Sequence, residues 1–261
     1  MQQAEDFMAE SRALANIREP LTEAEFATPT LFKGWTIDDV IGHLHMFNVA
    51  AEKTLESDVA FEEFFAPISA GLSAGRSLVE TQYPWLDGLQ GHALFAAWQQ
   101  TCERMAAGYG KADPKLRVKW AGPNMSARSS ITVRQMETWA HGQEVFDVLG
   151  LERVNTDRVR NIAHLGVSTF GWTFINRQLP VSASAPYVCL EAPSEAVWHW
   201  NMPQGDNTVT GLAEDFAKVV TQVRNVADTN LRVTGLVAIN WLAMAQCFAG
   251  PPEDPPASGS C

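Results

Sequence analysis

The sequence has 261 residues, of which 46% are hydrophobic and 19% are charged, and its formal net charge at pH 7 is −11. This balance is typical of a globular protein with enough chain for one large domain or two small ones. A net negative charge of this size argues against nucleic acid and anionic membranes as partners, because both require clustered Lys and Arg.

The start of the chain and its cysteines indicate the compartment. The N-terminus, MQQAEDFMAE, lacks the basic start and apolar core of a signal peptide, and the most apolar late stretch, residues 235–250, is too short to span a bilayer. The four cysteines include no CxxC pair, so neither a disulfide framework nor a thiolate zinc site is indicated. We therefore expect a cytoplasmic protein. We also expect it to act on a small molecule, as a monomer or a homodimer.

Helical patterns dominate the chain up to residue 178. One helix is predicted to begin at Thr36, because Thr36 and Asp39 have the spacing of a capping box. Residues 61–80 contain several Gly and Ser and are interpreted as a loop that leads into a short helix carrying Arg76. The other helices expected here span residues 3–17, 22–26, 86–109, 132–150 (capped by Thr132) and 155–177. These segments predict a helical bundle over residues 1–178.

The pattern changes near Pro180. Residues 187–192 and 196–201 are rich in aromatic and β-branched side chains and are separated by Pro-Ser-Glu, which predicts a β-hairpin. Further strands are expected at 208–210 and 231–234, and helices at 212–226 and 237–248. The sequence therefore predicts a small α+β domain over residues 179–250, followed by a Pro/Ser/Gly-rich tail, 251–261, that is predicted to be disordered.

Three side chains from two predicted helices could bind a metal ion. Glu137 and His141 are four residues apart, so their side chains can converge on one point, and His43 lies at the edge of the apolar stripe of the Thr36 helix. Each pattern alone also fits a surface Glu–His pair or a core-edge histidine. Two imidazoles and one carboxylate with open coordination positions suit zinc in a catalytic site or ferrous iron.

Three other common chemistries lack their usual motifs, because the chain contains no GxGxxG, GxxxxGK[ST] or HExxH. The nine tryptophans are interpreted as core side chains rather than as part of a site.

Two sequence motifs resemble those of a known family. Residues 34–44, GWTIDDVIGHL, are similar to the GWT-x-x-DVxxHL signature of the mycothiol-dependent maleylpyruvate isomerase-like family, in the DinB-like superfamily. Residues 137–144, ETWAHGQE, resemble its second motif, ExxxHxxD, with Glu144 where Asp is usual. Residues 209–216, VTGLAEDF, together with the preceding hairpin, are similar to the sterol-carrier-like domain appended in the family.

The resemblance implies a fold, a cofactor and a reaction. The fold would be an up-down-down-up DinB-like helical bundle followed by a sterol-carrier-like α+β domain. A divalent metal, usually zinc, with Fe2+ and Ni2+ as alternatives, would be bound by His43, Glu137 and His141. A low-molecular-weight thiol would be the cosubstrate of an isomerase or transferase that acts on a small electrophilic organic acid.

Four further residues are candidates for catalytic roles. The resemblance implies that Arg76 and Arg224 correspond, by position, to arginines that hold the substrate in the family. Glu144 is expected to orient an imidazole or relay a proton, and His164 to act as an acid or base. The alternatives are a solvated glutamate at a helix edge and a buried structural histidine.

Two other functions stay open. A metal-dependent hydrolase or lyase would use metal-bound water in place of a thiol. A non-enzymatic protein would hold an apolar ligand in the sterol-carrier-like domain, and its metal would be structural.

Overall fold

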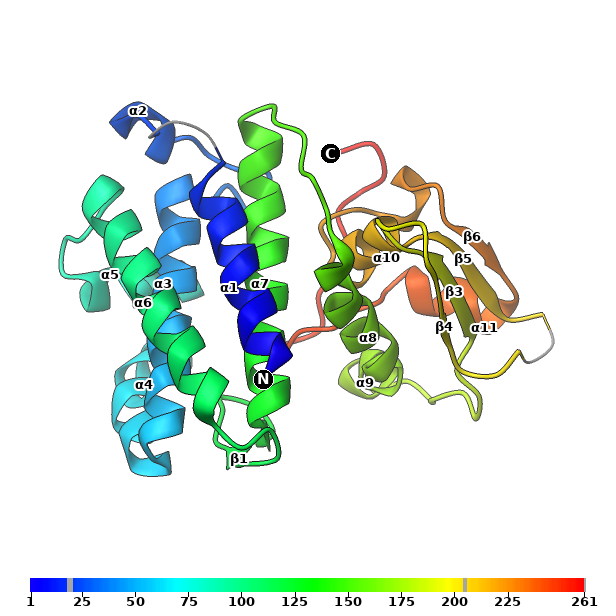
Figure 1. Cartoon of the computed structure of the whole chain (residues 1–261), viewed down its shortest axis with the longest axis horizontal. Coiled ribbons are helices and arrows are strands. Elements are labelled where there is room, and N and C mark those ends of the chain that lie inside the picture. The colour runs from blue at the N-terminus through cyan, green and yellow to red at the C-terminus, as the bar shows by residue number, and fades with distance from the viewer. Residues whose placement is uncertain (18–20, 204–205, 261) are drawn as a thin grey trace. The chain divides into compact units, whose positions relative to one another are not determined.

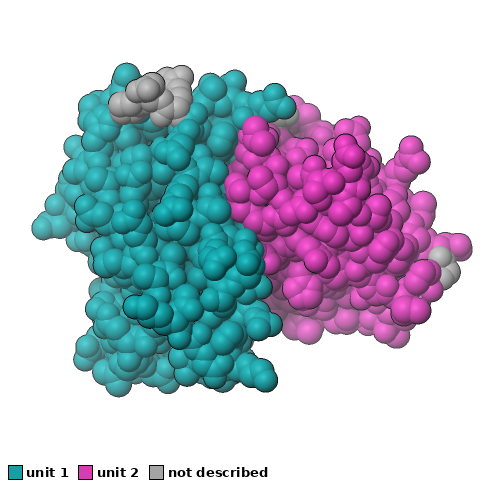
Figure 2. All heavy atoms as spheres, viewed as in Figure 1, with its two compact units in different colours: residues 1–152 teal, residues 153–261 magenta. Residues whose placement is uncertain are grey.

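A computed structural model describes residues 1–17, 21–203 and 206–260 of the chain. The chain divides into two compact units, Met1–Glu152 and Arg153–Cys261, which Figure 2 shows in teal and magenta. The boundary therefore differs from the one predicted near residue 178, because the helices that follow Glu152 pack within the second unit. None of the described helices is long and apolar enough to cross a membrane.

Four long helices form the first unit (Figure 1): α1 (Gln2–Ala15), α3 (Ile37–Glu56), α6 (Gly91–Lys111) and α7 (Ala127–Val148). The other elements of this unit are α2 (Glu23–Phe26), α4 (Asp58–Ser73), α5 (Leu78–Leu86) and the antiparallel strands β1 (Arg117–Val118) and β2 (Met125–Ser126). Buried apolar side chains from all four long helices make one core, which includes Phe7, Leu14, Ile41, Leu44, Trp98, Met105, Ile131 and Val145.

Hydrogen bonds at the helix ends fix the directions of three long helices. The carboxylate of Asp38, at the start of α3, accepts the backbone N–H of Gly91, at the start of α6, at 2.9 and 3.0 Å, so α3 and α6 run parallel. The amino group of Met1, before α1, donates to the carbonyl of Gly110, near the end of α6, at 3.2 Å, so α1 is antiparallel to α6. These directions agree with the predicted up-down-down-up bundle.

The capping box predicted at Thr36 is present. The backbone N–H and hydroxyl of Thr36 donate to Asp39 Oδ2 at 2.9 and 2.8 Å, and the N–H of Asp39 donates back to the Thr36 hydroxyl at 3.1 Å. Asp39 Oδ1 also accepts a hydrogen bond from the Tyr83 hydroxyl at 2.8 Å, which joins α5 to the first turn of α3. The start of α3 is therefore fixed both locally and by tertiary contact.

The loop predicted over residues 61–80 is wrong, because most of it belongs to helix α4. Phe61, Ile68 and Gly71 are its buried residues, and Ser57 caps its start. Gly71 does not mark a loop. It allows close packing, since a Cβ atom there would lie 2.8 Å from Cγ2 of Thr81. Arg76 lies in the turn between α4 and α5, not on a helix.

Two other helix boundaries differ from the sequence prediction. The helix predicted over 86–109 is interrupted after Leu86, where Asp87 and Gly88 both adopt positive φ, and α6 begins at Gly91. Helix α7 begins earlier than predicted and is capped by Ser126, whose side chain accepts the N–H of Ser129 at 3.1 Å. Sequence reasoning missed Ser126 as the cap, six positions before Thr132, because the short strand β2 leads directly into the helix.

The second unit contains a four-stranded sheet with the order β4-β3-β5-β6. The hairpin of β3 (Tyr187–Glu191) and β4 (Val197–Trp200) is confirmed, β3 pairs with β5 (Thr208–Leu212) in parallel, and β5 pairs with β6 (Arg232–Thr234) in antiparallel fashion. The helices are α8 (Arg160–Ser168), α9 (Phe170–Asn176), α10 (Ala213–Val220) and α11 (Leu236–Leu242), with 3-10 turns η1 (Asp157–Val159) and η2 (Val226–Asp228). The single helix predicted over 155–177 is therefore broken at Thr169. Whether this unit is sterol-carrier-like stays a prediction.

The described part of the predicted disordered tail is held against the second unit. Asn225 Nδ2 donates to the carbonyl of Pro256 at 2.9 Å, and Asp228 Oδ1 accepts the Ser258 hydroxyl at 2.8 Å and the Gly259 N–H at 3.0 Å. Composition did not predict this order, because the partners are polar side chains of a distant part of the chain.

Candidate metal centre

His43 of α3 and Glu137 and His141 of α7 meet at one point in the first unit. Nε2 of His43 and Nε2 of His141 each lie 3.3 Å from Oε2 of Glu137. One nitrogen or oxygen atom from each of the three residues falls within 4.8 Å of the others. The predicted metal-ligand residues are therefore brought together, although His43 and Glu137 are 94 positions apart in sequence.

Local geometry places each side chain. Glu137 and His141 are one helical turn apart on α7, so their side chains project from the same side of the helix. His43 lies in the second turn of α3, whose start is fixed by the capping box at Thr36. The two helices contact each other, and the three side chains bridge them.

Aromatic rings surround the two histidines. The turn before α3 contains Lys33 and Gly34 at positive φ, and it brings Phe32 and Trp35 over the site. The Phe32 ring meets the imidazole of His141 edge-on at 4.9 Å between centroids, and Trp35 stacks on the same imidazole. Trp35 is at the same time a member of the buried core, as predicted for the tryptophans, and a neighbour of the candidate site.

A third ring, that of Phe47, lies one turn along α3. Its centroid is 4.8 Å from that of His43. His43 thus has apolar neighbours on both sides, since Trp35 also lies 5.4 Å from it.

The electrostatics of the site favour metal binding. Burial lowers the pKa of His43 to about 4, against the opposing effect of its hydrogen bond with Glu137, so the imidazole is neutral at pH 7 and free to act as a ligand. Burial by itself would raise the pKa of Glu137, but hydrogen bonds from His141 and His43 hold that pKa well below its usual value. The carboxylate therefore carries its negative charge at the point where the imidazole nitrogens converge.

The donor set fits one divalent cation. Two nitrogens and one carboxylate oxygen match the three protein ligands of catalytic zinc sites, which keep a further coordination position open. One feature is unusual: Nδ1 of His43 is buried and has no hydrogen-bond partner among the described residues. Metal-binding histidines generally donate this second N–H to an acceptor, so Trp35 and Phe47 orient the His43 ring here by packing.

The other two candidate residues of the first unit differ in environment. Glu144 is buried on α7, three residues beyond His141, with 6% of its surface exposed, so the solvated alternative is wrong. Arg76 is exposed, and its backbone N–H donates to the carbonyl of Gly71 at 3.1 Å. The structure gives Arg76 no contact with the three metal-ligand candidates.

His164 and Arg224 belong to the second unit and have partners there. The indole N–H of Trp200 donates to Nδ1 of His164 at 3.2 Å, and the His164 side chain is exposed rather than buried. Nη1 of Arg224 donates to the carbonyl of Val223 at 2.8 Å. The candidate metal centre is therefore built from the first unit, and the roles predicted for these two residues stay predictions.

Sequence reasoning missed Arg134. It is 2% exposed and lies one turn before Glu137 on α7. The carbon at the centre of its guanidinium group lies 5.8 Å from the centroid of the Phe47 ring. A charged residue three positions before a candidate ligand, on the same helix, was the available signal.

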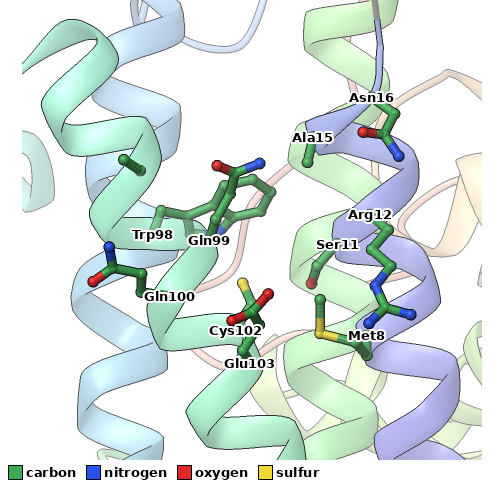
Figure 3. Close-up of a pocket in the computed structure, with 11 residues that line it drawn as sticks. Met8, Ser11, Arg12, Ala15, Asn16, Trp98, Gln99, Gln100, Cys102 and Glu103 are labelled. Carbon is green, nitrogen blue, oxygen red and sulfur yellow. The ribbon is translucent and has the colours of Figure 1, made fainter.

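A cavity of about 390 Å³ lies elsewhere in the first unit, between α1 and α6 (Figure 3). Its wall includes Ser11, Arg12, Asn16, Gln99, Cys102 and Glu103 and none of the candidate site residues. The convergence of ligand atoms, not this cavity, therefore marks the candidate functional site.

A DinB-like helical bundle with two histidines and one glutamate converging between two of its helices is the class of protein that the fold and site define. Residues 7–146 match the family described as Mycothiol maleylpyruvate isomerase N-terminal domain, and the chain belongs to this family.

The chain is also similar to two other proteins in sequence and to two solved structures in fold. The chain is 37% identical over 247 residues to two uncharacterized proteins of Mycobacterium tuberculosis, Rv0036c of strain H37Rv and MT0041 of strain CDC 1551, with 95% of each chain covered. Crystal structures of the mycothiol-dependent maleylpyruvate isomerase and of one of its mutants share the fold. Each has a TM-score of 0.52 and covers 84% of this chain and 87% of the other, at 15% and 14% identity.

Proposed function

We propose that this protein is a metal-dependent enzyme that uses a low-molecular-weight thiol to isomerise, or transfer a group to, a small electrophilic organic acid. The observation that carries the proposal is the convergence of His43, Glu137 and His141 within 4.8 Å. Membership of the isomerase family supports the thiol, since the solved structures of similar fold are of a mycothiol-dependent isomerase.

The chain's own residues would prepare the site for this chemistry. The imidazoles of His43 and His141 and the carboxylate of Glu137 would hold the metal, with Zn2+ as the first candidate and Fe2+ or Ni2+ as alternatives. A divalent ion held there would lower the pKa of a bound thiol and polarise a substrate oxygen. Phe32 and Trp35 would exclude water, which strengthens electrostatic interactions with a charged substrate.

Glu144 is the candidate to hold or move a proton. It is a buried carboxylate on the helix that supplies two of the metal ligands. In the proposed reaction, the thiol sulfur adds to an electrophilic carbon and is released again after the bond geometry has changed. A proton must leave the thiol before the addition and return on release, and a carboxylate near the site can accept and donate it.

The proposal is tested by measuring bound metal in the purified protein together with turnover of a panel of unsaturated keto acids, with and without added thiol. We expect turnover that requires both the metal and the thiol. Metal-dependent turnover without a thiol would favour a hydrolase or lyase, since the same three ligands could also activate water. Bound metal without turnover would favour the non-enzymatic alternative.

A further inference from the structure

Arg134 is a buried cation that forms no ion pair with a carboxylate among the described residues. Nε of Arg134 donates to Oδ1 of Asn48 at 3.0 Å, and its Nη2 atom is buried without a hydrogen-bond partner among the described residues. Asn48 is neutral, and it is itself fully buried. The carboxylate that acts electrostatically on Arg134 is Glu137, which is hydrogen-bonded to the two histidines instead.

The position of Arg134 connects it to the candidate metal centre. Its guanidinium group lies over the Phe47 ring at 5.8 Å, and the same ring contacts His43, at 4.8 Å between centroids. The cation and the ligand histidine are both buried and share this apolar ring as a neighbour. A charge acts more strongly in such surroundings than across solvent.

The sum of charges at the site is then positive. A divalent ion bound by two neutral imidazoles and one carboxylate leaves one positive charge, and Arg134 adds a second one nearby. Buried positive charge without compensation is unfavourable, and an anion in the open coordination position would reduce it.

We propose that Arg134 makes this centre select an anionic sulfur or oxygen ligand, such as a thiolate or a carboxylate, over a neutral one. The inference rests on the proposed metal centre. It goes beyond that proposal by naming the charge of the preferred ligand and the residue, Arg134, that causes the preference. Arg134 would act through its field, as a specificity-determining residue, without touching the metal.

The experiment compares ligand binding to the Co2+-loaded full-length protein by visible absorption, with azide as the anionic ligand and imidazole as the neutral one. Arg134→Met removes the charge. Asn48→Asp keeps the guanidinium group and places a carboxylate against its Nε atom, supplying the missing counter-ion. The control is Arg104→Gln, which removes a charge from an exposed position on α6 where Arg104 pairs with Glu52 at 3.1 Å.

We expect the azide dissociation constant to rise about tenfold in both Arg134→Met and Asn48→Asp, as for two charges about 10 Å apart at an effective dielectric constant of about 20. Imidazole binding should change by less than about twofold in either variant, because a neutral ligand gains little from the field. Arg104→Gln should leave azide binding within about twofold of the parent value, since exposed charges are screened.

The outcomes separate the two proposals. Unchanged azide affinity in Asn48→Asp and Arg134→Met, with Co2+ bound normally, would overturn the role of Arg134 and leave the metal centre standing. A parent protein that takes up no Co2+ would overturn both. If Arg134→Met does not fold, Asn48→Asp decides the question alone, because it changes neither the guanidinium group nor the volume of the core.

Discussion

The indole of Trp35 stacks on the imidazole of His141, with ring centroids 6.0 Å apart and 7° between the ring planes. Trp35 comes from the turn before α3, and His141 lies in the middle of α7. The stack therefore fixes the orientation of His141 from the turn that precedes α3, the helix of the other candidate ligand His43. Because Trp35 is 9% exposed, the contact is shielded from water.

Replacing Trp35 should affect both stability and the metal. We expect Trp35→Leu to lower the free energy of unfolding by about 3 kcal/mol, since a large buried ring is lost, and to weaken zinc affinity by about tenfold. The control is Trp98→Leu, which removes a fully buried ring of the same core. Chemical denaturation and competition with a zinc chelator measure the two effects. Equal loss of zinc affinity in both variants would show that the stack has no specific role.

Each of the three proposed ligands should be necessary for the metal. Alanine at His43, Glu137 or His141 should lower bound metal at least about tenfold, since two remaining ligands cannot hold the ion. His92→Ala is the matched control, because His92 is about half exposed and lies beside Glu23 instead. Elemental analysis after dialysis measures the content. Similar metal in all four variants would rule out the proposed centre.

The metal-free protein should lose stability as the solution becomes acidic. His43 has a folded-state pKa of about 4 against 6.5 for an unperturbed histidine, so between these values the unfolded chain binds a proton that the folded chain does not. Unfolding is therefore favoured as pH falls through this window, by up to about 3 kcal/mol. The pKa of Glu137 is also lowered, so the free energy of unfolding falls further as the pH drops below 4.5, the usual pKa of a glutamate.

The measurement is chemical denaturation of the chelator-treated protein from pH 7 to pH 4. His43→Gln should reduce the dependence between pH 6.5 and 4 without removing it, because a neutral amide replaces one titrating ring while burial also lowers the pKa of His45 to about 4. A parent and variant with parallel curves would mean that His43 titrates normally in the folded state.

Close packing of two helices in the second unit gives a separate prediction. A Cβ atom on Gly166 of α8 would lie 2.7 Å from Cγ2 of Val220 in α10, so Gly166→Ala should destabilise the unit by about 1–3 kcal/mol. Gly110→Ala in α6 meets nothing within 4 Å and should instead stabilise by up to about 1 kcal/mol, through helix propensity. Thermal unfolding followed by circular dichroism compares them, and a stabilising Gly166→Ala would contradict the packing.

Glu144→Gln tests the proposed proton transfer. The amide preserves the shape of the buried side chain but cannot exchange the proton, so we expect the variant to keep its metal and to lose thiol-dependent turnover by about 100-fold or more. A role in orienting the ligands would instead weaken metal binding by about 10–100-fold. Metal content and rate are measured side by side with the parent. If neither changes, Glu144 takes no part in the site.

Local patterns predicted the elements that depend on near neighbours in sequence. The capping box at Thr36 and the hairpin of β3 and β4 formed as expected, because their contacts lie within a few residues. Helix α4 was missed because Gly71 resembles a loop residue until its contact with Thr81 is known. The order of the tail was missed for the same reason, because it depends on contacts with Asn225 and Asp228 from elsewhere in the second unit.

The sequence by itself determined the bundle, the hairpin and the three residues that could bind a metal, because helical spacing and the two family motifs specify them. Only the tertiary structure decided that His43 meets Glu137 across 94 positions, that Trp35 and Phe47 enclose it, and that α8 and α9 belong to the second unit. The buried charge of Arg134 also became visible only there. Burial, pKa and hydrogen-bond satisfaction depend on neighbours distant in sequence, and packing alone chooses those neighbours.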